Sequence, residues 1–196
     1  MMVFVILILA YLLGSLPFGY ILTRLMHNTD IRNYGSGNIG ATNVLRVYGW
    51  RSALPVFILD LAKGLVAVLL ARAVIDLQAI YLTAGFLAMF GHSFSIYLKF
   101  KGGKAVATSI GVLLALSGWV TLVTVACFLA IVYFTRYVSL GSMISMLILP
   151  PVFWLLGFDL PYILFGLAAA VLVIVRHHEN IGRLLKGKES KLGRKG

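Results

Sequence analysis

The chain has 196 residues, of which 61% are hydrophobic and 12% are charged, and its formal net charge is +11. A soluble domain carries about 25% charged residues, so this composition argues against a soluble enzyme and indicates an integral membrane protein. An excess of Lys and Arg is typical of loops held on the cytoplasmic side of a membrane, and also of segments attracted to anionic lipids. Because Cys127 is the single cysteine, a disulfide framework is excluded.

Long apolar runs predict where the chain crosses the membrane, since a spanning helix needs about 20 apolar residues. Pro17 is expected to kink the end of the first run. That run lacks a basic start and a small-residue cleavage site, so we interpret it as a retained span and not as a signal peptide. The expected runs are 2–23, 52–74, 78–98, 105–134, 142–156 and 160–175.

The run 105–134 is long for one crossing and short for two. If it crosses twice, turning near Ser117 and Gly118, nearly all of the 17 Lys and Arg lie on the inner side. A single crossing would place the cations of the C-terminal tail outside, so the positive-inside rule favours two. We predict an all-α integral membrane protein with about seven transmembrane helices, an external N-terminus and a cytoplasmic C-terminus. It forms one domain, 1–196, with a basic tail from about residue 185.

Asp60, Lys63 and His92 lie inside these runs, where a charge costs several kcal/mol and therefore needs a reason. Asp60 and Lys63 are three residues apart, on one face of the second helix. We expect a structural ion pair, while a direct role in binding a ligand stays open. His92 lies near the inner end of the third run, either as a hydrogen-bonded packing residue or as a site residue.

Polar, glycine-bearing segments interrupt the apolar runs at three places. The first motif, residues 36–46, reads SGNIGATNVLR. Its small residues let backbone N–H groups turn toward an oxyanion, and Arg46 can bind phosphate bidentately. The second motif, residues 99–108, reads KFKGGKAVAT, in which Lys104 supplies a point charge and Gly102 and Gly103 permit a tight loop.

The third motif, residues 176–189, reads RHHENIGRLLKGKE. Arg176, Asn180 and Arg183 fall on one helix face, and His177 is a neighbour of Asn180. A juxtamembrane helix with snorkelling arginines would explain the cations but not Asn180 and His177. With the predicted topology, the three motifs meet on the cytoplasmic face and indicate one anion site.

Common catalytic and metal-binding motifs are missing from the sequence. There is no cysteine cluster, no HExxH, no paired-aspartate signature of metal-dependent alcohol phosphotransferases, no GxSxG and no P-loop. None of the four histidines begins an H-x4-D, the motif of thioester-using glycerolipid acyltransferases. We therefore expect no metal and no cofactor, and a site rich in cations and poor in carboxylates.

The motifs in this order resemble those of the bacterial membrane glycerol-3-phosphate acyltransferases that use acyl phosphate. Residues 36–46 resemble the family's SGNxGATNxxR without a mismatch, and 176–189 resemble RHxxNIxRLxxGxE. Residues 91–108 resemble the element centred on FKGGK, and Asp60, Lys63 and Gly64 resemble a recurrent LDxxKG element. Two departures occur: Ala105 stands where glycine is usual, and Ser95 where proline is common.

The resemblance implies transfer of a fatty acyl group from acyl phosphate to the 1-hydroxyl of sn-glycerol 3-phosphate. The products would be lysophosphatidic acid and phosphate, in the first step of bacterial phospholipid synthesis. The expected setting is the plasma (inner) membrane with the site on its cytoplasmic side, in contact with membrane lipids and without a nucleic-acid partner. We expect catalytic roles for Ser36, His177 and Asn180, and substrate binding by Gly37, Asn38, Thr42, Asn43, Arg46, Lys101, Gly102, Gly103, Lys104, Arg176 and Arg183.

Within that set, Thr42 and Asn43 are expected to shape the loop more than to do chemistry. Ser36 is expected to donate a hydrogen bond, although acylation of its hydroxyl is an alternative route. Two other classes of function are alternatives to an acyltransferase. A transporter for an organic phosphate favours internal repeats and polar groups at the bilayer midplane, which the sequence does not display. A non-catalytic scaffold leaves the three polar motifs unexplained.

Overall fold

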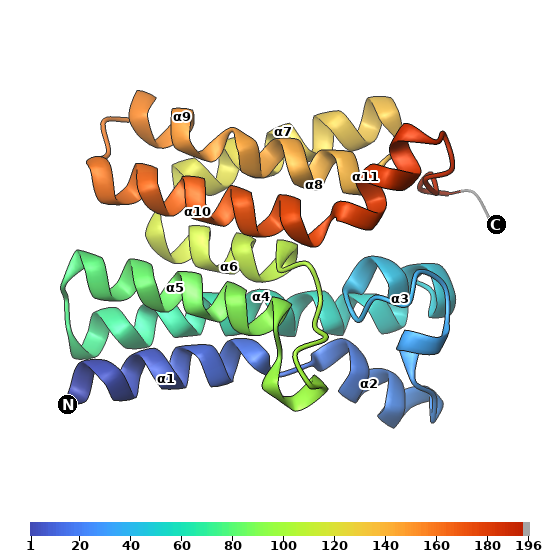
Figure 1. Ribbon diagram of the computed structural model, residues 1–196, viewed down its shortest axis with the longest axis horizontal. Coiled ribbons are helices and arrows are strands. Elements are labelled where there is room, and N and C mark those ends of the chain that lie inside the picture. The colour runs from blue at the N-terminus through green and yellow to red at the C-terminus, as the bar shows by residue number, and fades with distance from the viewer. Residues whose placement is uncertain (194–196) are drawn as a thin grey trace. The chain divides into compact units, whose positions relative to one another are not determined.

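The computed structural model describes residues 1–193, and every regular element in that part of the chain is helical. The chain divides into two compact units, Met1–Ala115 and Leu116–Gly196, which we call unit 1 and unit 2. Figure 1 shows the helices of both units in chain order.

Unit 1 contains the first and second motifs. The first span is interrupted at Leu16 and Pro17, which confirms the expected effect of the proline. Pro55, by contrast, lies within a continuous helix. The helices of unit 1 are α1 (Met2–Ser15), α2 (Phe18–His27), α3 (Ala41–Tyr48), α4 (Trp50–Val74), α5 (Gln78–Ser93) and α6 (Val106–Leu116), with short 3-10 helices η1 (Ile31–Asn33) and η2 (Ile96–Leu98).

Close backbone packing joins α1 to α5, which lie side by side in Figure 1. A methyl group on Gly14 would overlap the backbone of Ala88, and one on Gly91 would overlap the backbone of α1. Small residues at such crossings are the usual means of packing helices within a membrane. The Ser95 hydroxyl, just beyond α5, donates to the Ser15 carbonyl at 2.6 Å. This contact fixes the point at which the second motif leaves the helix pair.

Unit 2 contains α7 (Gly118–Thr135), α8 (Val138–Leu147), α9 (Leu149–Leu155), α10 (Leu160–Arg176) and α11 (His178–Leu185). The expected turn near Ser117 is confirmed, because Ser117 caps α7 and accepts a hydrogen bond from the Val120 amide at 3.4 Å. The expected run 142–156 falls on α8 and α9 and is not one straight helix. It is bent by 40° between α8 and α9, where Pro150 and Pro151 lack the N–H groups that a continuous helix needs.

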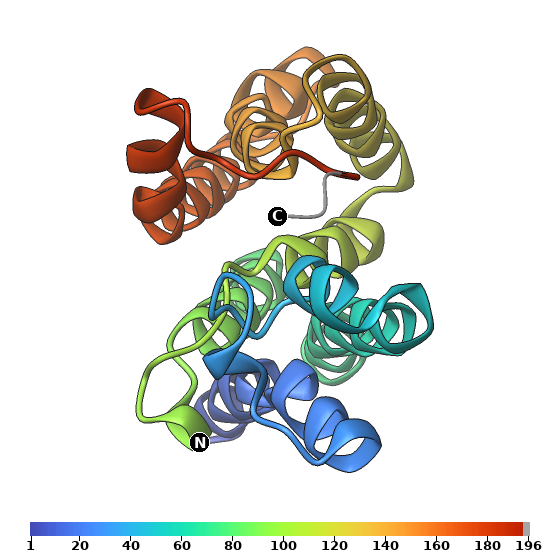
Figure 2. The same ribbon diagram turned by 90° about the vertical axis from the view of Figure 1, so that its right-hand side faces the viewer.

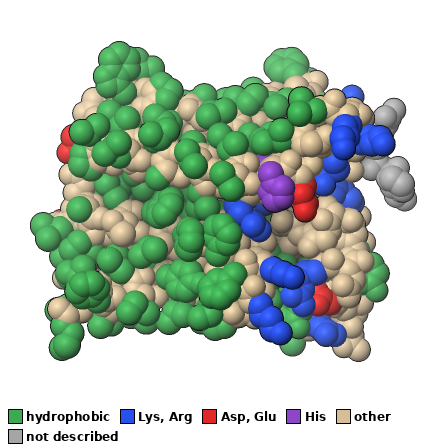
Figure 3. Space-filling model, in the orientation of Figure 1, with side chains coloured by type: hydrophobic (Ala, Val, Ile, Leu, Met, Phe, Trp, Pro, Cys, Tyr) green, Lys and Arg blue, Asp and Glu red, His purple; other side chains and the backbone are tan. Residues whose placement is uncertain are grey.

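Four helical segments of residues 1–193 are long and apolar enough to cross a membrane, and the number rises to six if each bent helix pair is one span. The segment expected as a seventh span is α6, whose 11 residues are fewer than the about 20 that a span needs. On the face of unit 1 in Figure 3, hydrophobic side chains cover most of the surface and the cations gather at one end. This distribution fits helices surrounded by lipid with a charged end in contact with water.

Candidate functional site

Asn43 organises the first motif. Its side-chain nitrogen donates to the carbonyl groups of Ile31, Tyr34 and Asn38, at 3.4, 3.0 and 2.8 Å. Its side-chain oxygen accepts a hydrogen bond from the Ser36 amide at 2.8 Å. The residue is 2% exposed, so these contacts satisfy buried backbone groups that would otherwise destabilise the loop. Asn43 therefore holds the loop of the first motif in its shape.

The residues expected to meet substrate lie on the outer side of this loop. Ser36, Gly37, Thr42 and Arg46 are exposed, whereas Asn38 is half-buried. The Asn38 side chain accepts from the Gly40 amide at 2.8 Å, which shapes the turn that leads into α3. Arg46 lies in the last turn of α3 and makes no ion pair with any described residue. Its guanidinium is therefore available for an anion.

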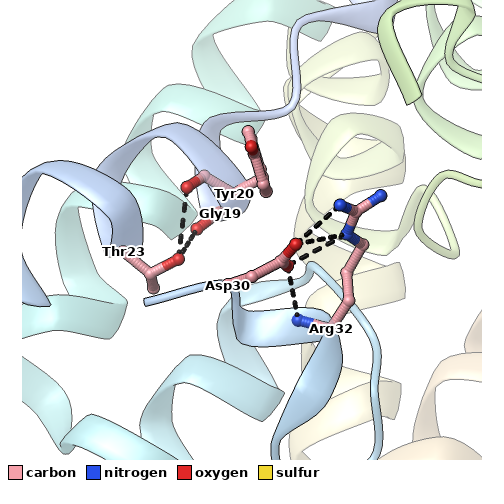
Figure 4. Close-up of polar contacts among 5 residues, drawn as sticks. All are labelled: Gly19, Tyr20, Thr23, Asp30 and Arg32. Atoms are coloured by element: carbon pink, nitrogen blue, oxygen red, sulfur yellow. Dashed lines mark hydrogen bonds and ion pairs between the residues drawn. The ribbon is translucent and has the colours of Figure 1, made fainter. Parts of the chain in front are cut away.

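The entrance to the first motif is fixed by Asp30 and Arg32, which Figure 4 shows in close contact. The Asp30 carboxylate accepts from Arg32 Nη2 at 2.6 Å and from the Arg32 amide at 3.1 Å. The hydrogen bond from the Arg32 side chain lowers the pKa of Asp30 below its usual value. The Arg32 guanidinium also lies 5.0 Å from the centre of the Tyr20 ring, so it joins η1 to α2.

The second motif folds back onto the end of α5. The Gly103 amide donates to the His92 carbonyl at 2.9 Å, and the Gly102 amide to the Ser93 carbonyl at 3.2 Å. A methyl group on either glycine would overlap His92, so both positions need glycine for close approach. Lys101 is exposed, and Lys104, which follows the two glycines, is half-buried.

Ala105 explains why glycine is usual at its position. Its φ of 60° lies in the left-handed region, which a residue with a Cβ adopts only at a cost of roughly 1–2 kcal/mol. Lys99 and Phe100 also have positive φ, at 52° and 63°. The second motif is therefore a tightly wound connection whose shape is imposed by its surroundings.

The buried charges of α4 form the expected ion pair. Lys63 Nζ lies 2.8 Å from Asp60 Oδ1, and the two side chains are 1% and 2% exposed. His92 Nδ1 lies 3.5 Å from the same carboxylate oxygen. All three belong to unit 1. Asp60 and Lys63 lie on α4, and His92 lies near the end of α5, beside the second motif.

In unit 2, the third motif begins where α10 ends. Arg176 is the last residue of α10, and His177, which is 3% exposed, separates α10 from α11. His177 Nδ1 lies 2.7 Å from the Val173 carbonyl oxygen. A carbonyl can only accept, so Nδ1 carries the hydrogen and Nε2 is the acceptor nitrogen when the ring is neutral.

Glu189 binds three side chains of unit 2. Its Oε1 accepts from the Ser139 hydroxyl and from Asn180 Nδ2, both at 2.6 Å, and its Oε2 accepts from Arg183 Nε at 2.7 Å. Burial raises the pKa of Glu189, but these three hydrogen bonds outweigh burial and leave the pKa below its usual value. Asn180 and Arg183, expected to contact substrate, are thus also part of a structural network.

Sequence reasoning did not assign Ser139 to this network, and did not list Glu189 as a site residue. No spacing rule links Ser139 to a residue 50 positions later. The Leu192 amide donates to the Arg136 carbonyl at 2.8 Å, which brings the described part of the expected basic tail against the start of α8. Arg194 and Lys195, the last cations of that tail, lie outside the described residues.

The structure therefore places the expected residues in two sets. Unit 1 holds the first and second motifs, whose segments lie toward the same end of that unit in Figures 1 and 2. Unit 2 holds the third motif. Within residues 1–193, no three His, Cys, Asp or Glu side chains are grouped so as to hold a metal ion.

Known proteins are similar to this chain in sequence and fold over almost their whole length. The family model described as glycerol-3-phosphate acyltransferase matches residues 4–187. The glycerol-3-phosphate acyltransferase of Thermoanaerobacter sp. (strain X514) is 44% identical over 191 residues, which cover 96% of this chain and 94% of the relative. That of Prochlorococcus marinus (strain MIT 9301) is 49% identical over 185 residues, covering 93% and 94%.

Two crystal structures of PlsY (YgiH), an integral membrane glycerol 3-phosphate acyltransferase, have the same fold. The glycerol 3-phosphate form has a TM-score of 0.94 and 36% identity, covering 98% of this chain and 96% of its own. The lysophosphatidic acid form has a TM-score of 0.91 and 35% identity, with the same coverage. The chain is therefore an all-α integral membrane protein that belongs to the glycerol-3-phosphate acyltransferase family.

Proposed function

We propose that this enzyme transfers a fatty acyl group from acyl phosphate to the 1-hydroxyl of sn-glycerol 3-phosphate. The products are lysophosphatidic acid and inorganic phosphate, and the reaction begins bacterial phospholipid synthesis. The observation that carries the proposal is the likeness to PlsY, whose structures are described as its glycerol 3-phosphate and lysophosphatidic acid forms. Those descriptions do not name the acyl donor, so acyl phosphate is a separate part of the proposal.

The distribution of charge supports acyl phosphate as the donor. Both proposed substrates carry phosphate, and the three motifs carry many cations beside few carboxylates. Phosphate is already a good leaving group near neutral pH, so the reaction does not require a strong general acid. The sequence also lacks the H-x4-D pair of the enzymes that use acyl thioesters.

Each motif has a proposed role in this reaction. Arg46 and Lys104, with Lys101, Gly102 and Gly103, bind the phosphate of the acceptor. The Ser36 hydroxyl and the Asn38 side-chain nitrogen donate hydrogen bonds to the acyl phosphate and to the oxyanion that develops on its carbonyl. Gly37, whose amide donates to the Tyr34 carbonyl at 3.0 Å, lets the acyl phosphate approach the backbone closely, and Thr42 and Asn43 shape the loop. Arg176 and Arg183 add positive charge in unit 2, where Glu189 already holds Arg183.

The chemical step is attack by the glycerol hydroxyl oxygen on the acyl carbonyl carbon. A new C–O ester bond forms, the C–O bond to phosphate breaks, and phosphate leaves with the electron pair. The hydroxyl proton passes either to His177 Nε2 or to a phosphate oxygen of a substrate. Since Nδ1 of His177 already donates to Val173, its Nε2 has the acceptor character that a base needs. Asn180 orients the hydroxyl or a phosphate oxygen.

We propose direct transfer, in which both substrates are bound together, because holding two reactants in place can itself lower the barrier by several kcal/mol. Ser36 then acts as a hydrogen-bond donor and not as a nucleophile. The enzyme should therefore take up no acyl group from labelled acyl phosphate without acceptor. A covalent acyl group on Ser36 that passes to added glycerol 3-phosphate at a competent rate would contradict direct transfer.

The function itself is tested with purified protein, synthetic acyl phosphate and glycerol 3-phosphate. Lysophosphatidic acid and inorganic phosphate should appear in equal amounts, and only when both substrates are present. The matched control is the Ser36→Ala, Arg46→Ala double variant, whose purification profile should be that of the wild type and whose rate should fall to background. Absence of product with the wild-type protein would reject the proposed function.

We further propose that the enzyme lies in the bacterial plasma (inner) membrane, with an external N-terminus and all three motifs in the cytoplasm. The positive-inside rule supports this orientation. In a variant without Cys127, single cysteines at Asn33, Lys101 and Lys188 should escape an impermeant thiol reagent in intact cells and react after lysis. Labelling of one of them in intact cells would overturn the orientation.

A further inference from the structure

The buried charges of unit 1 form a continuous series of contacts that the proposed chemistry does not use. Lys63 Nζ donates to the Leu16 carbonyl at 2.7 Å, at the break between α1 and α2. The same ammonium group lies 2.8 Å from Asp60 Oδ1, which lies 3.5 Å from His92 Nδ1. The series therefore joins α1, α4 and α5 through three side chains that are almost fully buried.

One end of this series has a structural explanation. Pro17 has no N–H and the α1 helix stops just before it, so the last carbonyl groups of α1 lack their usual helical partners. The Lys63 ammonium supplies a donor to one of these carbonyls, and Asp60 balances its charge. A structural ion pair would need nothing more than these two groups.

The other end does not have that explanation. His92 Nδ1 faces the Asp60 carboxylate at 3.5 Å, a charge contact that is too long for a good hydrogen bond, and the ring is turned with Nε2 toward Gly103. A methyl group on Gly103 would overlap this Nε2 atom, and the Gly103 amide donates to the His92 carbonyl at 2.9 Å. The ring and backbone of His92 are thus the surface on which the second motif rests.

We infer that Asp60 and His92 are positioning residues for the acceptor phosphate, acting through Gly103 on Lys104. Asp60 fixes the orientation of the His92 ring, and the ring fixes the position of the backbone at Gly102 and Gly103. Lys104 follows that loop directly, so its backbone position depends on His92. This inference rests on the proposed function, since it assigns the Lys104 ammonium to glycerol 3-phosphate.

The test separates the binding of the two substrates. His92→Ala should raise KM for glycerol 3-phosphate about tenfold while KM for acyl phosphate and kcat change by less than about twofold. Calorimetry with glycerol 3-phosphate alone should show the same loss of affinity. The matched control is Thr124→Val, which removes another buried polar group, 2% exposed, whose hydroxyl bonds only within α7, and should leave both KM values unchanged.

A second pair of variants tests the contact between the ring and the glycine. Gly103→Ala should also raise KM for glycerol 3-phosphate, because the added methyl group overlaps the His92 ring. In that variant, replacing His92 by alanine removes the overlapping atoms and should raise KM by much less than it does in the wild type. If the rise in KM of the double variant equals the product of the two single rises, the two residues act independently and the inference is wrong.

Asp60 is tested with both buried charges removed together, because a single unpaired charge in this place could prevent folding. The Asp60→Leu, Lys63→Met double variant removes both charges and the oxygen that faces His92, and it should fold and show the same selective rise in KM for glycerol 3-phosphate. If it and His92→Ala instead lower kcat or the active fraction with both KM values unchanged, the cluster serves packing alone and the inference is wrong. An inactive wild-type protein would reject the proposed function instead, so the two failures are distinguishable.

Discussion

The first and third motifs each depend on a buried asparagine, but the two asparagines are held by different chemistry. Asn43 bonds only to neutral backbone groups, three carbonyls and one amide. Asn180 donates to the carboxylate of Glu189, which also binds Ser139 and Arg183. The hydrogen bonds of Asn43 therefore do not depend on pH, whereas those of Asn180 depend on an ionised group.

The largest effect is expected when Asn43 loses its donor. Asn43→Asp can still accept from the Ser36 amide, but it leaves three carbonyl groups facing a carboxylate. Each buried polar group left unpaired costs about 1–3 kcal/mol, so the thermal unfolding temperature should fall strongly and activity should be lost. Asn33→Asp is the matched control, since Asn33 is exposed in η1. Equal stability of the two variants would show that Asn43 does not organise the loop.

A smaller effect is expected at Glu189. Glu189→Gln keeps the shape but removes the charge that accepts from Ser139, Asn180 and Arg183, and hydrogen bonds to charged groups contribute about 1.5–3 kcal/mol. We expect a loss of about 2 kcal/mol in stability, measured by denaturation in detergent. The control is Glu179→Gln, because the Glu179 carboxylate is 63% exposed and lies 3.7 Å from Arg183. A larger loss at Glu179 would contradict the network.

Arg46 of the first motif and Arg183 of the third motif should respond differently to replacement by lysine. Arg46→Lys keeps the charge but loses the planar fork, so KM for glycerol 3-phosphate should rise about tenfold without a change in stability. Arg183→Lys should instead lower the unfolding temperature, with a smaller change in KM, because Glu189 holds Arg183. Steady-state kinetics and thermal unfolding of both variants check this, and a reversed pattern would exchange the two roles.

Acid should weaken the third motif through Glu189. The pKa of Glu189 is lowered from 4.5, so its contribution to stability is complete above about pH 4.5 and is lost as the pH falls through the lowered pKa. The stability difference between the wild type and Glu189→Gln should therefore shrink in acid. For Asn43→Ala, where the wild-type residue does not titrate, the difference should stay constant over the same range. If the stability difference between the wild type and Glu189→Gln stays constant in acid, the charge of Glu189 does not stabilise the third motif.

Much of the fold follows from apolar run length and proline position. The break at Pro17 and the turn at Ser117 were both predictable, because each rests on the local chemistry of a few neighbouring residues. The bend between α8 and α9 also has a local cause in Pro150 and Pro151, which the span-length argument passed over. The ion pair of Asp60 with Lys63 follows from helical spacing.

The site is less accessible from sequence, because its contacts join residues far apart in the chain. The motifs indicate which side chains matter, but not that Asn43 would face inward while Ser36 and Arg46 face outward. The contact of Ser139 with Glu189 and that of His92 with Gly103 depend on how the helices pack. Ala105 shows the same limit, since its positive φ is imposed by the folded connection and not by its own preference.

The choice of acyl donor tests the central claim most directly. The purified enzyme is assayed with glycerol 3-phosphate and, in separate reactions, with acyl phosphate, acyl-CoA and acyl carrier protein carrying the same acyl chain. We expect kcat/KM with acyl phosphate to exceed that with either thioester at least about a hundredfold, a difference of about 2.7 kcal/mol in transition-state stabilisation. A comparable rate with a thioester as the sole donor, in a preparation free of other enzymes, would contradict it.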